Sequence, residues 1–458
     1  MPIATTDPAT GIVIREYSPH NNDEVDIKID EARRAFVALK HTDFPKRAAW
    51  MHRAADMLEA ESEHVATTIV KEMGKPITQA RGEVAKCVTG MRFYAEHSQE
   101  FLSGHELPRP SVVGASSASV RYQPLGTVLA VMPWNYPLWQ VIRFAAPALM
   151  AGNTGLLKHA SNVPQSALYL DSLFERAGFP AGCFRTLLIP ASRVEAVARD
   201  SRVAAVTLTG SEPAGRSIGA IAGAELKPSV LELGGSDPFI VMSSADISRA
   251  VATAVTSRTS NNGQACINAK RFIVHADVYD SFVDKFVVAM ESLKVGPPMD
   301  EETDVGPIAT STGRDELHQL VGDARKHGAK VATGGEKLEG GGWYYPPTVI
   351  TGVTKGMRLY AEEAFGPVAT VFRVADRQEA LELANDTTFG LSSAVWTQDS
   401  AEEAFFVDGI EAGAVFVNGM SVSYPELPFG GVKDSGIGRE LSAEGIREFC
   451  NLKTVWRG

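Results

Sequence analysis

Apolar residues recur at three- and four-residue spacing along much of the first hundred residues, the pattern of amphipathic helices. The pattern is clearest in DEARRAFVAL and in KRAAWMHRAADMLEAESEHVATTIVKEM, and it predicts helices from about Asp30 to Phe101. The segment Ser111–Gly126 then changes to short pieces of alternating polarity with glycine. This change predicts a β-hairpin after a helical N-terminal region.

From Gly126 onward, apolar runs of strand length alternate with helical stretches. The predicted strands are GTVLAVMP, TGLLKHA, RTLLIP and AAVTLTG, and the predicted helices include LWQVIRFAAPALMAG and VPQSALYLDSLFERAG. Near-continuous apolar strands separated by helices indicate a parallel sheet that is buried on both faces. The alternation begins again after LELGGSDPFIVM, through a helix near residues 247–257 to the strand RFIVH. The sequence therefore predicts an α/β protein with two α/β units.

The composition and charge of the chain exclude several classes of protein. The chain has 458 residues, 44% hydrophobic and 22% charged, which is typical of a globular protein with a large core. Its net charge of −11 argues against a nucleic-acid surface. The N-terminus lacks the features of a signal peptide, and no segment approaches the roughly 20 consecutive apolar residues that span a bilayer. We therefore expect a cytoplasmic protein without nucleic-acid or membrane partners.

The four cysteines are scattered along the chain. Cys87, Cys183, Cys266 and Cys450 show no CxxC spacing, so the familiar zinc patterns are excluded and no metal site is expected. Cys266 follows a Gly-Gln pair in NNGQACINAKRFIVH and precedes an apolar strand. It is either a packed core thiol or a nucleophile, and a nucleophile needs an oxyanion donor and a base.

Two polar residues could supply those roles. Asn135, in MPWNYP, follows the first predicted strand of the parallel sheet, where ligands of such sheets bind. Glu232, between two leucines in LELGGSDP, ends an apolar strand, where a carboxylate must find a partner, become neutral or take part in chemistry. Asn135 could equally be a turn residue, and Glu232 could form an ion pair.

The first α/β unit contains no GxGxxG motif. Instead, LTGSEPAG places Gly210 and Ser211 between a strand and a helix, where free backbone N–H groups suit a phosphate. The same Gly-Ser pair is also an ordinary helix cap.

Taken together, these segments resemble the aldehyde dehydrogenase superfamily. The resemblance covers nearly the whole chain and rests on PWNYP, KHASN, LTGS, LELGGSDP, NNGQACI, EEAFGPV and LPFGGVKDSGIGRE, in the order and spacing of the family. The segments GRELSAEGIREFCNLKTVW and GMSVSYPELPFGG look most like bacterial succinate-semialdehyde dehydrogenases of the shorter type.

The resemblance implies a catalytic set. Cys266 falls on the nucleophile, Asn135 on the oxyanion-hole amide and Glu232 on the general base. It implies oxidation of an aldehyde to a carboxylic acid through a cysteine thiohemiacetal and a thioester, which water then hydrolyses. Gly263 and the pair Gly234-Gly235 suit a backbone that approaches the thiol and the cofactor closely. The other three cysteines are expected to be structural.

The resemblance also implies a dinucleotide cofactor. The cofactor-binding residues that it indicates are Trp134, Asn135, Lys158, His159, Ala160, Ser161, Gly210, Ser211, Leu233, Glu363 and Phe365. NAD-preferring relatives typically carry a glutamate three residues after the motif lysine, where this chain has Ser161. A carboxylate there would repel a 2′-phosphate, so we expect NADP+, with NAD+ as the alternative. Ser161 could also act as a helix N-cap.

The substrate is expected to be an aldehyde with a distal carboxylate, above all succinate semialdehyde. Arg143 lies eight residues beyond Asn135, just over two helical turns, and its planar fork suits a carboxylate. The resemblance places an arginine of this register on the distal carboxylate. Trp139, Ser423 and Tyr424 are the other expected substrate contacts. The alternative for Arg143 is a salt bridge to a neighbouring domain.

Two departures from longer relatives bear on the substrate site. A second arginine of those enzymes, six residues before the nucleophile, is replaced by Ser260. The redox-partner cysteine that some relatives carry two residues after the nucleophile is replaced by Asn268.

The family architecture implies two Rossmann-like open-sheet α/β domains with a protruding β-hairpin oligomerisation element. The expected divisions are a cofactor domain at 1–105 and 125–233, a catalytic domain at 234–442, and the oligomerisation element at 106–124 and 443–458. A protruding hairpin exposes strand edges, which pairing with a neighbouring subunit would satisfy. A homodimer or homotetramer is therefore expected.

Three other functions compete with this one. A redox-free cysteine acyltransferase or hydrolase would usually need an oriented histidine base, and none of the ten histidines lies in a motif of that kind. A binding protein that has lost activity would not need Cys266, Glu232 and Asn135 together. A CoA-acylating enzyme is disfavoured because Glu232 is present for hydrolysis. Dehydrogenases for glutarate-type or neutral aldehydes remain alternatives for the substrate.

Overall fold

The N-terminal region is helical, as its periodicity predicts. In the computed structural model, which describes residues 2–458, a small antiparallel pair of strands precedes the helices, β1 (Ile3–Thr6) and β2 (Val13–Tyr17). The helices that follow are α1 (Asn22–Leu39), α2 (Phe44–Ala60), α3 (Ser62–Met73) and α4 (Ile77–Phe101). Their buried faces supply much of the largest hydrophobic core, together with helix α5 (Trp139–Ala151).

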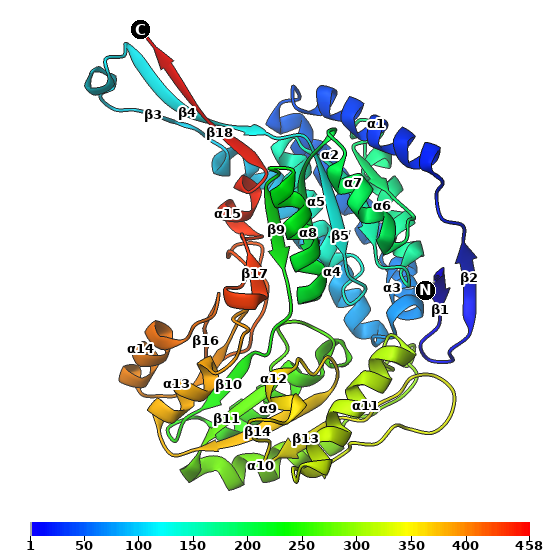
Figure 1. Ribbon diagram of the computed structural model, residues 1–458, viewed down its shortest axis with the longest axis vertical. Helices are drawn as coiled ribbons and strands as arrows, with labels where there is room; N and C mark the ends of the chain where they lie inside the picture. The colour runs from blue at the N-terminus through cyan, green and yellow to red at the C-terminus, as the bar shows by residue number, and fades with distance from the viewer. Residues whose placement is uncertain (1) are drawn as a thin grey trace.

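A six-stranded sheet forms the upper body of the molecule (Figure 1). Its order is β17-β9-β8-β5-β6-β7, parallel throughout except for the short edge strand β17. The strands are β5 (Thr127–Met132), β6 (Thr154–His159), β7 (Phe184–Thr186), β8 (Val203–Thr209), β9 (Ser229–Glu232) and β17 (Gly436–Ile437). The helices between them are α5, α6 (Pro164–Arg176), α7 (Val194–Arg199) and α8 (Glu212–Ala224).

A seven-stranded sheet forms the lower body (Figure 1). Its order is β12-β13-β14-β11-β10-β15-β16, and only the edge strand β12 is antiparallel. The strands are β10 (Pro238–Val241), β11 (Arg271–His275), β12 (Lys330–Thr333), β13 (Thr348–Thr351), β14 (Val368–Val374), β15 (Ala394–Trp396) and β16 (Phe416–Val417). The main helices of this region are α9 (Ile247–Thr259), α10 (Ala276–Glu291), α11 (Ser311–Lys326), α12 (Arg358–Ala361), α13 (Arg377–Asn385) and α14 (Ser400–Gly409).

The apolar run LELGGSDPFIVM belongs to both bodies. Its first part is β9 of the six-stranded sheet, and its last part is β10 of the seven-stranded sheet. Glu232 ends β9, and the glycines that follow it carry the chain from one sheet to the other. The two-sheet α/β fold predicted from the alternation is confirmed.

The predicted hairpin is part of a three-stranded antiparallel sheet that projects from the upper body (Figure 1). Its order is β18-β4-β3, from β3 (His105–Glu106), β4 (Ser117–Pro124) and β18 (Cys450–Arg457). The C-terminal strand pairs along the whole length of β4, after the short helix α15 (Ser442–Arg447). Among residues 2–458, no helix is both long and apolar enough to cross a membrane.

Candidate active site

Cys266 and Asn135 are brought together by two loops that belong to different sheets. Asn135 follows β5, and Cys266 lies between α9 and β11. The side-chain amide of Asn135 donates to the backbone carbonyl of Gln264 at 3.0 Å, and the amide of Asn261 donates to the carbonyl of Asn135 at 2.9 Å. These bonds tie the two loops to each other, and one N–H of the Asn135 amide is left for another acceptor.

The loop before Cys266 has an unusual backbone. Asn261, Asn262 and Gly263 all have positive φ, at 57°, 57° and 72°. At Gly263 a Cβ would lie 2.4 Å from the backbone carbon of Gly366, so only glycine fits there. The close approach expected of Gly263 therefore exists, but it is to the segment that carries Phe365 and not to the thiol.

The backbone on both sides of Cys266 is held by a buried lysine. Lys270 donates to the carbonyls of Ala265 at 2.9 Å and of Cys266 at 2.5 Å, and it forms an ion pair with Glu363 at 2.9 Å. A Cβ at Gly235 would lie 2.8 Å from the Cys266 carbonyl oxygen, so this glycine packs directly against the nucleophile loop, as the sequence predicted.

One cavity of about 280 Å³ collects most of the residues singled out in the sequence. It lies where the ends of β5 and β8 face the Cys266 loop, between the two sheets. Those of its lining residues that the sequence predicted are Trp134, Asn135, Gly210, Ser211, Leu233, Gly234, Cys266, Glu363 and Phe365. The rings of Trp134 and Phe365 meet edge to face, with their centroids 5.7 Å apart, and form one side of this space.

Burial raises the pKa of the Cys266 thiol to about 12. The positive charges of Arg143 and Lys270 oppose this shift, and the carboxylates of Glu363 and Asp237 add to it. In this state of the site the thiol is therefore protonated at neutral pH, and it must lose its proton when it attacks an electrophile.

Glu232 is buried at the end of β9, with 2% of its surface exposed. Neither of its carboxyl oxygens has a hydrogen-bond partner among the described residues. Burial is the main cause that raises the pKa of Glu232 well above its ordinary value, and the neighbouring Glu440 raises it further. Arg143 and Arg439 act in the opposite direction. An unpartnered carboxyl with a raised pKa has the properties of a general base.

The guanidinium of Arg143 is not free to face the substrate, as the sequence-based expectation requires, because it is already paired. It is 3% exposed and forms a buried ion pair with Glu440. Its guanidinium also lies over the ring of Phe429, 4.5 Å from the centroid. The alternative for Arg143, a salt bridge to a neighbouring domain, is the arrangement observed, because Glu440 lies in the segment assigned to the catalytic domain. The sequence pattern could not show this, because Glu440 lies almost three hundred residues further along the chain.

The segment expected to bind the adenosine end of a dinucleotide lies at the end of β6. Lys158 is 7% exposed, and burial alone lowers its pKa. No carboxylate of residues 2–458 pairs with its ammonium. Ser161 is half-buried, and its carbonyl accepts the amide of Ala4 at 3.0 Å. The helix α6 begins at Pro164 with Val163 at the N-cap, so the interpretation of Ser161 as a helix cap is wrong.

His159 differs from its neighbours, because its side chain is used to hold a loop. Its Nε2 donates to the carbonyl of Pro137 at 2.8 Å, while its Nδ1 accepts the amide of Ala160 at 3.0 Å. Burial lowers the pKa of His159 to about 4, so the ring is neutral. The imidazole thus fastens the PWNYP loop to β6 and has no nitrogen left for a ligand.

The start of helix α8 has free backbone donors. Ser211 occupies the N-cap position, as the helix-cap alternative predicts, but its side chain makes no capping hydrogen bond. The first amides of the helix therefore remain available at the edge of the cavity, which suits a phosphate.

Two of the expected substrate contacts meet next to the cavity. Trp139 Nε1 donates to Ser423 Oγ at 3.0 Å. Lys86 Nζ, which belongs to none of the sequence motifs, donates to the same oxygen at 2.7 Å. Ser423 and Tyr424 line a small pocket together with Ile267, the residue after Cys266, and with Phe429.

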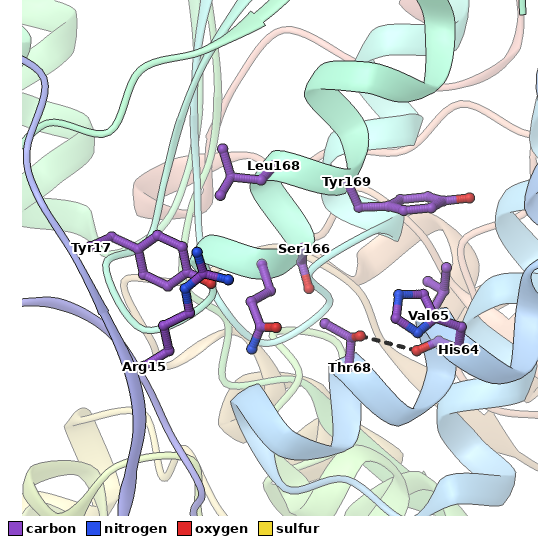
Figure 2. A pocket seen from close by; sticks show the side chains of 9 residues that line it. Arg15, Tyr17, His64, Val65, Thr68, Ser166, Leu168 and Tyr169 are labelled. Carbon is purple, nitrogen blue, oxygen red and sulfur yellow. Dashed lines mark hydrogen bonds between the residues drawn. The ribbon is translucent and has the colours of Figure 1, made fainter. Parts of the chain in front are cut away.

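A separate cavity of about 290 Å³ lies between β2, α3 and α6. Figure 2 shows the side chains that line it, which come from β2, α3 and α6 and include Arg15, His64 and Tyr169. None of the residues predicted to carry chemistry lines it. Across residues 2–458, no three His, Cys, Asp or Glu side chains are grouped so that they could hold a metal ion.

The sequence pattern of the aldehyde dehydrogenase family matches residues 1–455. The chain belongs to the aldehyde dehydrogenase family. Among curated members of this family, it is 62% identical over 459 residues to succinate-semialdehyde dehydrogenase (NADP(+)) 1 of Mycobacterium ulcerans, with 100% of both chains covered. It is 61% identical over 456 residues to the protein of the same name from Mycobacterium tuberculosis, again with 100% of both covered.

Solved structures of the family agree with this fold. The succinic semialdehyde dehydrogenase of Streptococcus pyogenes, in complex with NADP+, superposes with a TM-score of 0.96 at 36% identity, with 99% of each chain covered. An NADP-dependent enzyme of E. coli gives a TM-score of 0.96 at 33% identity, covering 100% of this chain and 95% of the other.

Several residues that shape this aldehyde dehydrogenase site were missed in the sequence. Lys270, Glu440 and Lys86 are charged residues that burial forces into specific contacts. Lys270 lies four residues after Cys266 in NNGQACINAKRFIVH, and Glu440 ends LPFGGVKDSGIGRE, so both lie in or next to motifs of the family. A charged residue inside a conspicuous motif was the signal that could have found them.

Proposed function

We propose that this protein oxidises succinate semialdehyde to succinate with NADP+ as the hydride acceptor. The observation that carries the proposal is the single cavity in which Cys266 and Asn135 face the free N-terminus of α8 and the Gly210-Ser211 turn. The names of the relatives that are 61–62% identical over the full length support both the substrate and the cofactor. The corresponding test is the appearance of reduced nicotinamide absorbance when succinate semialdehyde and NADP+ are added.

The residues present fit a phosphorylated dinucleotide. The uncapped start of α8 suits the pyrophosphate, and Lys158 brings a buried ammonium without a carboxylate partner to the adenosine end. Ser161 is small and neutral at the position where a carboxylate would repel a 2′-phosphate. When bound, the nicotinamide accepts the hydride that leaves the reacting carbon.

Cys266 and Asn135 carry the first half of the reaction in this proposal. The sulfur of Cys266 bonds to the aldehyde carbon as its thiol proton is lost, which gives a thiohemiacetal. The oxyanion of this intermediate accepts hydrogen bonds from the Asn135 amide and the Cys266 backbone N–H. Loss of hydride from the carbon then leaves a thioester on Cys266.

Glu232 carries the second half. Its carboxylate takes a proton from water, the resulting hydroxide bonds to the thioester carbon, and the carbon–sulfur bond breaks to release the acid and Cys266. The carboxyl oxygens of Glu232 have no hydrogen-bond partner among the described residues, so both are free to accept a proton from water. Lys270 keeps the carbonyls beside the nucleophile fixed, and Arg143 lowers the cost of charge on Glu232.

The competing functions are separated by the same assay. A redox-free acyltransferase or hydrolase would turn over a thioester or ester without any change in nicotinamide absorbance. A dehydrogenase for a neutral aldehyde would prefer butanal to succinate semialdehyde. A glutarate-type enzyme would prefer the longer semialdehyde at equal concentrations.

We also propose that the protein works as a homodimer or homotetramer. The β18-β4-β3 sheet and the turn between β3 and β4 project from the body (Figure 1). They present large exposed apolar side chains. Val112, Leu452 and Trp456 are 66%, 59% and 53% exposed. Pairing or packing against a second copy would cover this surface, because exposed strand edges and apolar side chains favour association.

A further inference from the structure

We propose that Lys86 is a specificity-determining residue, which binds the distal carboxylate of the substrate together with the hydroxyl of Ser423. The inference rests on the proposed oxidation of a carboxylate-bearing aldehyde, and it adds a binding residue that the sequence did not indicate. Lys86 lies on α4, more than three hundred residues from Ser423.

The hydrogen bonds around Ser423 show which ligand this site suits. Ser423 is buried, and its oxygen accepts from Lys86 Nζ at 2.7 Å and from Trp139 Nε1 at 3.0 Å. A serine oxygen has two acceptor positions, so both are occupied, and the hydroxyl proton must be donated elsewhere. The ammonium of Lys86 also has further N–H groups to donate. Ser423 and Lys86 thus keep free donors, which match a carboxylate, while the single N–H of Trp139 holds the serine oxygen in place.

Lys86 carries a charge without a nearby counter-ion. Among the described residues, no carboxylate lies within ion-pair distance of its ammonium. The closest candidate along its helix is Glu83, one turn away, which is already engaged. Glu83 forms an ion pair with Lys75 at 2.5 Å and accepts the amides of Leu138 and Trp139 at 2.8 and 3.0 Å.

The surroundings of Lys86 disfavour its positive charge, so a bound anion would stabilise it. Its ammonium lies 4.6 Å from the centroid of the Trp139 ring. Burial lowers the pKa of Lys86 to about 8, and the nearby charge of Arg143 lowers it further. A partly desolvated ammonium gains more from a carboxylate ligand than an exposed one does.

Lys86 is placed beside the catalytic loops. It lines a cavity of about 500 Å³ together with Tyr136, which follows Asn135, and with Asn261, which binds the Asn135 carbonyl. Ser260 lines the same cavity and adds no charge. The other cations of this region are already paired, Arg143 with Glu440 and Lys75 with Glu83. Lys86 is therefore the cation left for the substrate.

Kinetics of Lys86→Met and Lys86→Arg test this assignment. Methionine keeps most of the length of the apolar stem and removes the charge. We expect Lys86→Met to raise KM for succinate semialdehyde about 10-fold or more, the loss of one charge-assisted hydrogen bond. The ratio of kcat/KM for succinate semialdehyde to that for butanal should fall by a similar factor, and Lys86→Arg should recover part of it. Lys71→Met, at an exposed position of α3, is the matched control and should leave the ratio unchanged.

The pH dependence gives a second, independent measurement. KM for succinate semialdehyde in the wild type should rise as the pH increases through about 8, when Lys86 loses its proton, and this rise should be absent in Lys86→Met. The other charged groups that act on Lys86 are Glu83, Cys87, Lys75 and Arg143, and all four stay unchanged in the variant.

The outcomes are distinguishable. A Lys86→Met enzyme with an unchanged substrate ratio would overturn the assignment, and so would one in which both aldehydes lose equally. If Arg143→Met alone lowers the ratio, the carboxylate is held by Arg143 and not by Lys86. A wild-type enzyme that already prefers butanal would instead refute the proposed substrate, before any variant is considered.

Discussion

Arg143 and Glu440 form an ion pair in the interior of the protein, where 3% and 5% of their surfaces are exposed. The pair joins helix α5 to the C-terminal segment and lies close enough to Glu232 to influence its pKa from both sides. Glu440 raises the pKa of Glu232, whereas Arg143 lowers it. The pair therefore links the packing of two distant segments to the proton affinity of the proposed base.

Removal of one partner of this pair should be costly for stability. Arg143→Ala leaves Glu440 buried without a counter-ion, so the free energy of unfolding should fall by about 3–5 kcal/mol. The double variant Arg143→Met/Glu440→Leu should recover much of this loss. Urea unfolding followed by fluorescence measures both. Arg358→Ala, which breaks an exposed pair with Glu362, is the matched control and should cost at most about 1 kcal/mol. Equal losses in Arg143→Ala and the control would contradict the role of burial.

The two halves of the proposed reaction should separate in variants. Cys266→Ala should abolish oxidation and leave NADP+ binding nearly intact. Glu232→Gln should keep a first-turnover burst of reduced cofactor, reduced if Glu232 also activates the thiol, but slow the steady-state rate. Asn135→Ala should lower kcat by about 10²–10³, the usual loss for an oxyanion donor. Stopped-flow absorbance checks these expectations, and full steady-state activity in Glu232→Gln would refute the assignment of the base.

The raised pKa of Glu232 predicts the sign of the pH dependence. Below its raised pKa the carboxyl is neutral and cannot accept a proton, so the steady-state rate should fall as the pH decreases, at a higher pH than for an exposed glutamate. Assays of kcat against pH test this. The Glu232→Gln variant should keep only a small rate, and that rate should no longer depend on pH in this range. A rate that stays level down to the ordinary range of glutamate would contradict the raised pKa.

Cofactor preference should respond to Ser161. Ser161→Glu introduces a carboxylate next to the expected position of the 2′-phosphate, so kcat/KM for NADP+ should fall much more than that for NAD+. Ser161→Ala is the control, because it removes the hydroxyl without adding charge. Steady-state kinetics with each cofactor measure the ratio. A wild-type preference for NAD+ would refute the proposed cofactor.

The projecting sheet should control assembly. The double variant Val112→Lys/Leu452→Lys places charges on its exposed apolar surface, and the resulting protein should sediment as a smaller species than the wild type. Leu226→Lys is the matched control, since Leu226 is 92% exposed but lies elsewhere, just after α8. Analytical ultracentrifugation distinguishes the species. A wild-type monomer would contradict the proposed assembly.

Much of the fold followed from the sequence, because hydrophobic periodicity reports which faces are buried. The strand at 154–160 is observed as Thr154–His159, and the helix at 163–178 as Pro164–Arg176. The short edge strand Gly436–Ile437 could not be predicted. It consists of two residues, and it pairs with β9 of the six-stranded sheet although it lies in the segment assigned by sequence to the catalytic domain.

The site was partly predictable for a similar reason. Asn135 was predictable because it follows a parallel strand, where ligands of such sheets bind, whereas Cys266 precedes a strand of the other sheet and was recognisable only from its motif. The partners of charged residues depend on packing between distant segments. Periodicity carries no information on such packing, so the pairing of Arg143 with Glu440 and the contact of Lys86 with Ser423 required the structure.

The antiparallel pairing of Gly436–Ile437 with β9 has a consequence for biosynthesis. Because this strand and Glu440 lie more than two hundred residues after Glu232, the ribosome must add all of the seven-stranded sheet before Glu232 gains these neighbours. Proteins of this size generally begin to fold during synthesis, from the N-terminus onward. A nascent chain can thus form the five strands β5 to β9 early, while the surroundings of Glu232 stay incomplete until residues 436–440 have been added.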